Sequence, residues 1–407
     1  MKSKLLLFTL CSLLTVGAYA SQPRKVLIIG LDGVRMDALQ QATAPNIDSL
    51  LVSGMFSYTD WHMGYTISGP SWSDMMTGVW EAKNGVTNNS YSTSNFYNYP
   101  YWPTLAKQFK PNLFCVEIVE YQPLYYQVYN ESWDYKYLIP SGSSGCATAA
   151  QQQLANDSLD GLFVYFEKVD EVGHSSGFSP TNPAYMQAIT YTDSLVGTVL
   201  TALHNRPHYS SEDWLIIIVT DHGGIGTTHG TYTNEERNIW CGYKSTHITP
   251  RQVTTGDPGD YQNTSQNPID TAIMRMSPVH VDVATTAIHH LIYETGINPG
   301  TYAPWSLDGK SWLDGATGVQ SLANNEMEAK IYPNPSSGLV ALWFENGPSD
   351  KVSYQVTDMT GRIVAENDNV VKTSLKLNID LGGLAKGVYN ISVNVGSQHF
   401  NRKFDLY

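Results

Sequence analysis

The chain has 407 residues, too many for one domain of ordinary size, so we expect two folded domains. Hydrophobic residues make up 42% and charged residues 15%, a balance typical of globular proteins that excludes a largely disordered chain. The formal net charge of -13 argues against a nucleic-acid polymer as partner, because little basic surface is available to displace counterions. A small phosphorylated ligand stays compatible with this charge, since bound metal ions can supply positive charge.

The N-terminus has the three parts of a signal peptide, which we place at residues 1–20. Lys2 and Lys4 are basic, Leu5 to Val16 is apolar but short for a membrane span, and Ala18 to Ala20 has the small-x-small pattern of a cleavage site. Nothing further along the chain is long and apolar enough to be a transmembrane helix.

Three cysteines lie beyond this segment: Cys115, Cys146 and Cys241. No CxxC pair occurs, so a thiolate zinc site is not expected. A disulfide between Cys115 and Cys146 and three buried thiols are both left open.

Short apolar runs that do not alternate predict parallel strands buried on both faces of a sheet. Apolar residues at helical spacing separate them, and strands that alternate with helices imply an α/β doubly wound sheet. The predicted strands are Val26–Leu31, Leu113–Val119, Leu162–Phe166 and Trp214–Val219, and the predicted helices are Asn46–Val52, Tyr185–Leu203 and Ala284–Ile292.

The pattern changes near the C-terminus. Period-two stretches such as Val352–Val356 and Tyr389–Val393, separated by turn pairs, predict a small antiparallel β-sandwich. We therefore expect an α/β domain over residues 21–310, a linker over 311–328 and a β-domain over 329–407.

Candidate metal ligands follow three of the predicted strands: Asp32, then Asp170 with His174, and Asp221 with His222. In an open α/β sheet, ligands bind beyond the carboxyl ends of the strands, so these side chains are predicted to meet in one crevice. Imidazole and carboxylate ligands together suit zinc.

A candidate nucleophile lies in Thr66–Gly78. Pro70 suits the first turn of a helix, which places Ser68 or Gly69 at its N-terminus, where free N–H groups favour an anion. A hydroxyl coordinated to zinc there would ionise more readily.

These motifs resemble the alkaline phosphatase superfamily over Val26 to about Ile292, with the nucleotide pyrophosphatase/phosphodiesterase branch the most similar. The resemblance rests on LIIGLDGVRMDAL, SGPSWSDMMTG, YFEKVDEVGHSSG, IIIVTDHGG and GTTHG. It implies a two-zinc hydrolase of small phosphate esters that acts through a phosphoseryl intermediate on Ser68. The implied ligands are Asp32, Ser68, Asp221 and His222 for one ion and Asp170, His174 and His229 for the other, with His280 as the alternative to His229; other divalent metals are compatible.

The same resemblance leaves substrate contacts and alternatives open. Gly69, Ser71 and Arg35 are candidate phosphoryl contacts, although Ser71 stands where the family has Asn. The segment also resembles the sulfatase signature, but Trp72 replaces the Arg that this signature requires. A phosphomonoesterase is therefore the first alternative, and a sulfatase, a phosphomutase and a non-catalytic binding protein rank below it.

The last residues resemble the C-terminal sorting domain of the type IX secretion system, in IYPNPSSG, DMTGRIV and LAKGVYNISV. The resemblance implies an interaction with that secretion machinery, and a protein released from or held at the surface of a Gram-negative bacterium.

Overall fold

A computed structural model divides the chain into two compact units, residues 1–318 and 319–407, which are described separately. The structure describes residues 22–127, 132–314, 329–332, 336–344, 352–358, 362–370, 376–395 and 398–407. The predicted signal peptide and most of the predicted linker lie outside these ranges. Within them, no helix combines the length and apolar character that crossing a membrane would need.

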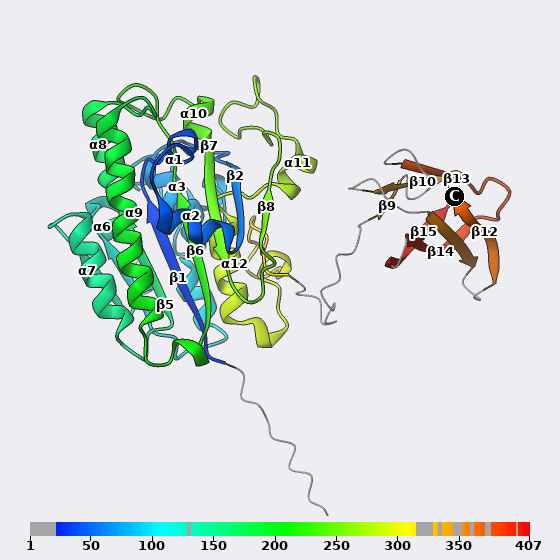
Figure 1. Ribbon diagram of the computed structural model, residues 1–407, viewed down its shortest axis with the longest axis horizontal. Helices are drawn as coiled ribbons and strands as arrows, with labels where there is room; N and C mark the ends of the chain where they lie inside the picture. Colours follow the sequence, from blue (N-terminus) through cyan, green and yellow to red (C-terminus); the bar gives the residue numbers. More distant parts are fainter. Residues whose placement is uncertain are drawn as a thin grey trace, which may run out of the picture. The chain divides into compact units, whose positions relative to one another are not determined.

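The first unit is built on an eight-stranded sheet (Figure 1). The strand order is β4-β3-β5-β1-β6-β7-β2-β8, and β7 alone among these strands runs antiparallel to its neighbours. The strands are β1 (Arg24–Leu31), β2 (Met55–Trp61), β3 (Cys115–Val119), β4 (Tyr135–Leu138), β5 (Gly161–Phe166), β6 (Asp213–Thr220), β7 (Asn238–Lys244) and β8 (Arg251–Val253).

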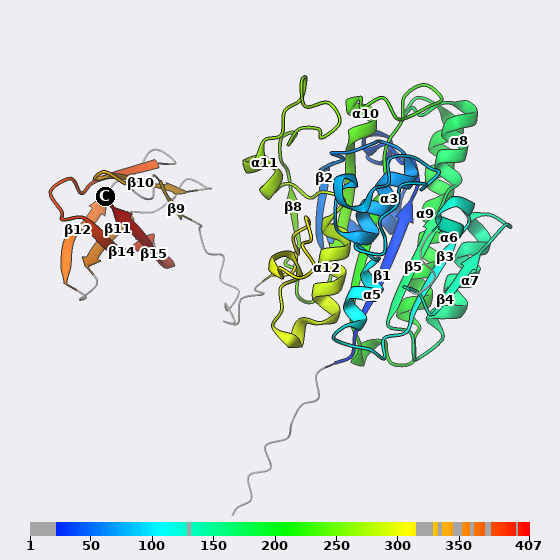
Figure 2. The same cartoon turned by 180° about the vertical axis from the view of Figure 1, so that it is seen from behind.

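Helices cover both faces of this sheet. One face carries α2 (Pro45–Val52), α7 (Ser143–Leu154) and α9 (Pro183–His204), and the other carries α3 (Ser68–Thr77), α5 (Trp102–Lys107) and α12 (Asp282–Leu291) (Figures 1 and 2). The other α-helices of this unit are α1 (Met36–Leu39), α4 (Glu81–Asn84), α6 (Gln122–Gln127), α8 (Lys168–Ser176), α10 (Asn234–Arg237) and α11 (Thr271–Met276).

Strand β1 shows why the apolar runs do not alternate. Val26 and Ile28 pack in the core beside α3, α5 and α12, whereas Leu27 and Ile29 pack in the core beside α2, α7 and α9. Successive side chains of a strand point to opposite faces, so a strand covered on both faces needs apolar residues at every position. The predicted doubly wound, mostly parallel sheet is confirmed.

The second unit consists of two antiparallel sheets in the orders β13-β10-β9 and β12-β11-β14-β15. Alternate residues such as Val352, Val356 and Ile391 point into its own buried core, as the period-two pattern predicts. The strands are β9 (Ala329–Tyr332), β10 (Leu339–Phe344), β11 (Val352–Asp358), β12 (Ile363–Val370), β13 (Lys376–Asp380), β14 (Gly387–Val395) and β15 (Gln398–Leu406).

The positions of the cysteines decide between a Cys115–Cys146 disulfide and three buried thiols. Cys115, Cys146 and Cys241 are buried free thiols. Cys115 lies in the core on one face of the sheet and Cys146 in the core on the other, so the sheet separates their sulfurs. The disulfide option is wrong for this physical reason.

Candidate active site

The candidate ligands meet at the carboxyl ends of the central strands because β1, β5 and β6 are parallel neighbours. Leu31, the last residue of β1, pairs with Phe166 at the end of β5 and with Thr220 at the end of β6. Asp32 and Asp221 therefore leave the sheet side by side. Helix α8, just after β5, brings Asp170 and His174 to the same end of the strands.

One group of potential metal ligands consists of Asp32, Asp221 and His222, whose ligand atoms lie within 4.8 Å of one another. His222 Nε2 is 3.3 Å from Asp221 Oδ2 and 3.6 Å from Asp32 Oδ1. All three side chains are buried.

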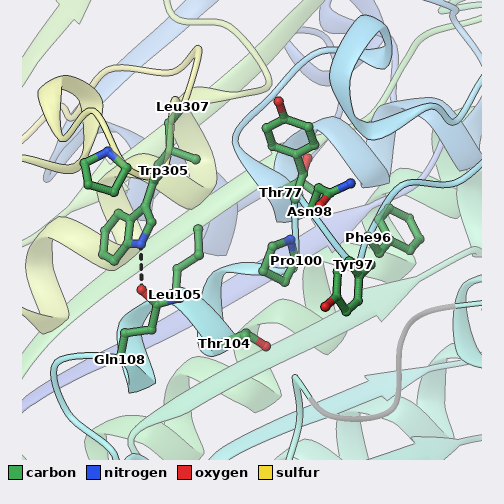
Figure 3. Close-up of a pocket in the computed structure, with 12 residues that line it drawn as sticks. Thr77, Phe96, Tyr97, Asn98, Pro100, Thr104, Leu105, Gln108, Trp305 and Leu307 are labelled. Carbon is green, nitrogen blue, oxygen red and sulfur yellow. Dashed lines mark hydrogen bonds between the residues drawn. The ribbon is translucent and has the colours of Figure 1, made fainter.

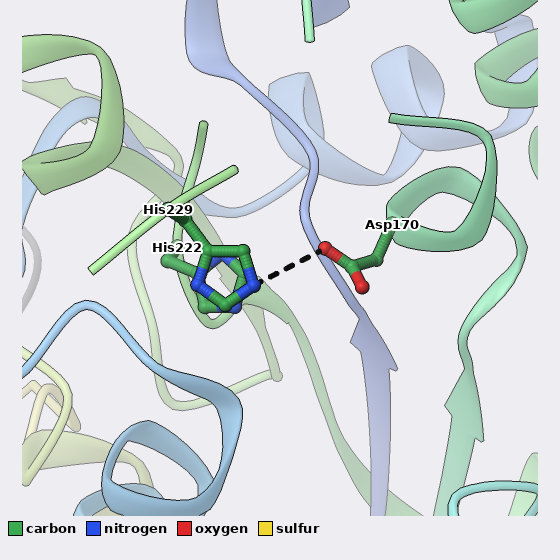
Figure 4. A group of neighbouring side chains, drawn as sticks. All are labelled: Asp170, His222 and His229. Carbon is green, nitrogen blue, oxygen red and sulfur yellow. Dashed lines mark ion pairs between the residues drawn. The ribbon is translucent and has the colours of Figure 1, made fainter. Parts of the chain in front are cut away.

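A second group consists of Asp170, His222 and His229 (Figure 4). His229 Nε2 lies 3.8 Å from Asp170 Oδ1, and the rings of His229 and His222 stack with centroids 3.8 Å apart. His174 adds to this group, since its Nε2 is 3.3 Å from Asp170 Oδ2. The two groups adjoin each other and share His222.

His174, His222 and His229 all turn Nε2 toward the candidate ligand groups and Nδ1 away from them. Nδ1 of His174, His222 and His229 lies 2.8–2.9 Å from a backbone carbonyl oxygen, which can only accept a hydrogen bond. In the neutral rings Nδ1 therefore carries the proton and Nε2 presents its lone pair to the site, the arrangement found in metal-ligating histidines.

The pKa values differ among the three rings. Burial lowers the pKa of His222, and it lowers that of His229 to about 4, so both rings are neutral at pH 7. The hydrogen bond to Asp170 raises the pKa of His174 to about 9. The Nε2 atoms of His174 and His229 are only 3.2 Å apart, so a positive charge, either a proton or a cation, belongs between them.

Three carboxylates of the two ligand groups each have a buried oxygen without a hydrogen-bond partner among the described residues. These oxygens are Asp32 Oδ1, Asp170 Oδ1 and Asp221 Oδ2. Burial and the charge of Asp170 raise the pKa of Asp32 to about 7, while burial and the charge of Asp32 raise that of Asp221. Unpaired buried carboxylates are costly, and divalent cations bound by this nitrogen and oxygen set would satisfy them.

Ser68 is the first residue of α3, and all ten residues of that helix are buried. Its Oγ lies 3.3 Å from His222 Nε2 and is therefore adjacent to the first ligand group. The helix places this hydroxyl at its positive end, where backbone N–H groups lack intrahelical partners.

Gly69 and Ser71, two of the predicted substrate contacts, are arranged differently. The Gly69 N–H donates to Asn89 Oδ1 at 2.7 Å, which brings the Asn89 side chain next to the residue that follows Ser68. Ser71 Oγ instead donates to the Ile67 carbonyl and lies 2.7 Å from His62 Nε2 in the interior. Asn89 escaped the sequence analysis because it lies in an exposed loop 20 residues after Gly69 with no periodic pattern.

Arg35 and His280 stand apart from the two ligand groups. Arg35 donates to Asp37 through two nitrogens and to two backbone carbonyls through the third. His280 is buried against the His62 ring, at a centroid distance of 4.3 Å. The structure thus gathers His229, not its alternative, with Asp170 and His222.

The aromatic stretch between Tyr91 and Trp102 mostly packs into the core, since Tyr91, Phe96, Tyr101 and Trp102 are buried. A cavity of about 370 Å³ lies beside it, near Thr77 at the far end of α3 from Ser68 (Figure 3). Its described lining is apolar, aromatic, hydroxyl and amide in character, unlike the ligand groups.

Two protein families match different parts of the chain. Residues 26–128 and 100–237 match the model of the type I phosphodiesterase/nucleotide pyrophosphatase family, which covers more than half of the 407 residues. The chain belongs to this family. All seven predicted metal-site residues fall inside the matched part of this phosphodiesterase-family chain. Residues 330–405 match the secretion system C-terminal sorting domain.

Relatives of this family member are distant. It is 24% identical over 267 residues to human ectonucleotide pyrophosphatase/phosphodiesterase family member 5, covering 59% of this chain and 52% of that protein. Mouse family member 7 is 22% identical over 229 residues, covering 51% of each chain. The chain thus spans about half the length of the curated relatives it matches.

Solved structures share the fold. A protein from Bacteroides thetaiotaomicron that is assigned to the sulfatases superposes with a TM-score of 0.54 at 14% identity, covering 80% of this chain and 83% of that one. A 2-O GAG sulfatase gives a TM-score of 0.51 at 12% identity, covering 94% and 83%. At such identities the likeness establishes the architecture of this phosphodiesterase-family chain and leaves its reaction open.

Proposed function

We propose that this chain is an exported two-metal hydrolase of small phosphate esters, with a preference for phosphodiesters and with Ser68 as its nucleophile. The position of Ser68 carries the proposal. Its Oγ lies 3.3 Å from His222 Nε2, the atom shared by both candidate ligand groups. A lone serine at a helix end would be an ordinary cap, whereas this one contacts the histidine that both ligand groups share.

The residues present fit two divalent cations. Asp32, Asp221, His222 and Ser68 would hold one, and Asp170, His174 and His229 would hold the other. Zinc suits the mixed nitrogen and oxygen donors, and other divalent metals are compatible. When bound, such a pair supplies Lewis acidity and charge neutralisation for an in-line displacement at phosphorus.

The proposed reaction has two steps. Ser68 Oγ attacks phosphorus and gives up its proton, which ends on the departing oxygen, so an Oγ–P bond forms while the bond to the leaving oxygen breaks. Water then attacks the phosphoseryl group from the side the leaving group has vacated, which releases the phosphate product and returns a proton to Ser68. The Gly69 N–H donates to Asn89 Oδ1 and so places the Asn89 carboxamide near Ser68, where its nitrogen can donate to a non-bridging oxygen.

A phosphomonoesterase is the first alternative, because both reactions need the same ligands and nucleophile. A sulfatase is less favoured. The signature Arg is replaced by Trp72, whose indole N–H donates to Asp32 Oδ2 at 3.3 Å and so has a different task.

Export is supported by the sorting-domain match over residues 330–405. We propose that the signal peptide at residues 1–20 directs the chain to the periplasm of a Gram-negative bacterium. Residues 329–407 then engage the type IX secretion machinery, for release or for display at the cell surface.

The purified protein should be assayed with bis-p-nitrophenyl phosphate, p-nitrophenyl phosphate and p-nitrophenyl sulfate side by side. We expect the wild-type protein to hydrolyse the diester and Ser68→Ala to do so at least about 10³-fold more slowly. Ser73→Ala is the matched control, since Ser73 lies on the same helix and its Oγ donates to the Gly69 carbonyl. Sulfate as the best substrate, or full activity in Ser68→Ala, contradicts the proposal.

A further inference from the structure

Arg35 lies in the segment after β1, three residues beyond Asp32, and its side chain is 12% exposed. Its Nε and one terminal nitrogen donate to the two carboxylate oxygens of Asp37, at 2.9 and 2.7 Å. This paired contact fixes the plane of the guanidinium and aims its third nitrogen inward.

That third nitrogen, Nη1, joins two segments that are distant in sequence. It donates to the Phe178 carbonyl and to the Gly224 carbonyl, both at 3.1 Å. Phe178 follows α8, which carries Asp170 and His174, and Gly224 comes two residues after His222. One side chain therefore bridges all three segments that supply candidate ligands from the ends of β1, β5 and β6.

Phe178 passes this restraint on to two of the imidazoles. Its ring lies edge-on to His174, with centroids 5.3 Å apart, and edge-on to His229 at 6.2 Å. The ring packs against the backbone of Gly173 and Gly224, since a Cβ on these glycines would come 2.3 and 2.4 Å from it. A shift of the Phe178 backbone would therefore change the packing against the rings of both histidines.

We infer that Arg35 is a positioning residue that sets the affinity of the metal centre, and does not itself contact substrate. Four of its five N–H groups are engaged within the protein. The inference rests on the proposed function, since it concerns the cations that this function requires. Arg35→Lys keeps the charge, but a lysine ammonium cannot pair with both Asp37 oxygens while reaching two carbonyls.

A matched control is available near the amino-terminal end of β6, away from the candidate ligands. Arg206 pairs with both Glu212 oxygens and donates to the carbonyls of Leu154 and Asn156, the same set of contacts as Arg35. It lies near the start of β6, whereas the ligands lie at its end. Arg206→Lys should therefore disturb folding stability to a similar degree without touching the metal centre.

The test measures zinc binding by the full-length chain, through competition with a chromophoric chelator and through bound zinc per chain at buffered free zinc. Arg35→Lys is expected to weaken zinc binding about tenfold and to lower the bound zinc from two toward one per chain. Arg206→Lys is expected to lower the melting temperature but to keep the wild-type zinc affinity. Asp37→Asn, which releases the guanidinium but retains Arg35, should show a smaller loss in the same direction and carries the test if Arg35→Lys does not fold.

The outcomes separate the two proposals. Wild-type zinc affinity in Arg35→Lys, or in Asp37→Asn if that variant alone folds, overturns the role of Arg35 and leaves the proposed function intact. Equal losses of affinity in Arg35→Lys and Arg206→Lys also overturn it, because the effect is then one of general stability. A wild-type protein that binds no zinc or other divalent metal overturns the metal centre and this inference together.

Discussion

The Tyr165 hydroxyl donates a 2.5 Å hydrogen bond to Oδ2 of Asp32, from one parallel strand to the end of its neighbour. The Trp72 indole N–H donates to the same oxygen at 3.3 Å. Two aromatic donors thus occupy one oxygen of this carboxylate and orient the other, Oδ1, toward His222. Outer partners of this kind commonly fix metal ligands.

Removing the Tyr165 hydroxyl should weaken the metal centre. Tyr165→Phe keeps the ring and its packing but frees Asp32 to rotate, so we expect zinc affinity to fall about tenfold. Chelator competition measures this change. Tyr243→Phe is the control, because that buried hydroxyl has no hydrogen-bond partner among the described residues. Equal affinities in the two variants would show that Tyr165 does not orient Asp32.

Asn89 should matter for turnover more than for substrate binding. Its carboxamide adjoins the Gly69 N–H beside Ser68, where charge builds up on a non-bridging oxygen during phosphoryl transfer. We expect Asn89→Ala to lower kcat by about 10²-fold. Asn88→Ala, a change at the neighbouring exposed residue, should have little effect. A loss confined to KM would place Asn89 outside the stabilisation of the transition state.

Metal removal should reverse the pH dependence of stability. In the metal-free protein, burial and Asp170 raise the pKa of Asp32 from 3.8 to about 7. The folded state then holds a proton that the unfolded state has already lost, so stability is full below about pH 4 and declines as the pH rises toward 7.

Calorimetry in the presence of a chelator tests this directly. We expect the melting temperature to fall by at least about 5 °C between pH 5 and pH 8, and to fall less in Asp32→Asn. With zinc present the trend should reverse, because protons and cations compete for the same ligand atoms. A metal-free protein that is equally stable at both pH values would contradict the crowding of carboxylates at this site.

The sequence pattern alone predicts the central parallel strands of the sheet. The runs at Val26, Leu162 and Trp214 are buried on both faces and became β1, β5 and β6, since only a doubly covered strand tolerates continuous apolar residues. Strands β7 and β2 were not foreseen. Asn238–Lys244 pairs antiparallel to β6, and its neighbours in the sheet are set by long-range contacts that a local pattern does not encode.

Some residues of the candidate site are likewise predictable from the sequence, and others are not. Asp32 and Asp221 could be placed because each directly follows a strand whose end is readable from the sequence. Ser71 and Asn89 could not, because side-chain direction on a buried helix and the path of an exposed loop depend on tertiary packing. Arg35 resembled an anion contact in the sequence, and only the structure reveals the carboxylate and carbonyls that engage it.

The C-terminal unit should act in export alone. Deleting residues 329–407 should leave an enzyme with unchanged turnover of bis-p-nitrophenyl phosphate that stays in the periplasm, because the sorting-domain match covers 330–405 and the candidate site lies before residue 230. Cell fractionation with activity assays measures this. Export of the shortened chain would remove the assigned role of this unit.

Two divalent cations are expected to bind beside Ser68. The most direct measurement is an anomalous difference map, recorded at the zinc absorption edge, from crystals of the zinc-loaded protein. We predict two peaks about 3.5–4 Å apart, one against Asp32, Asp221 and His222 and the other against Asp170, His174 and His229. A map without a peak at these side chains, in crystals soaked with excess zinc, would contradict the account.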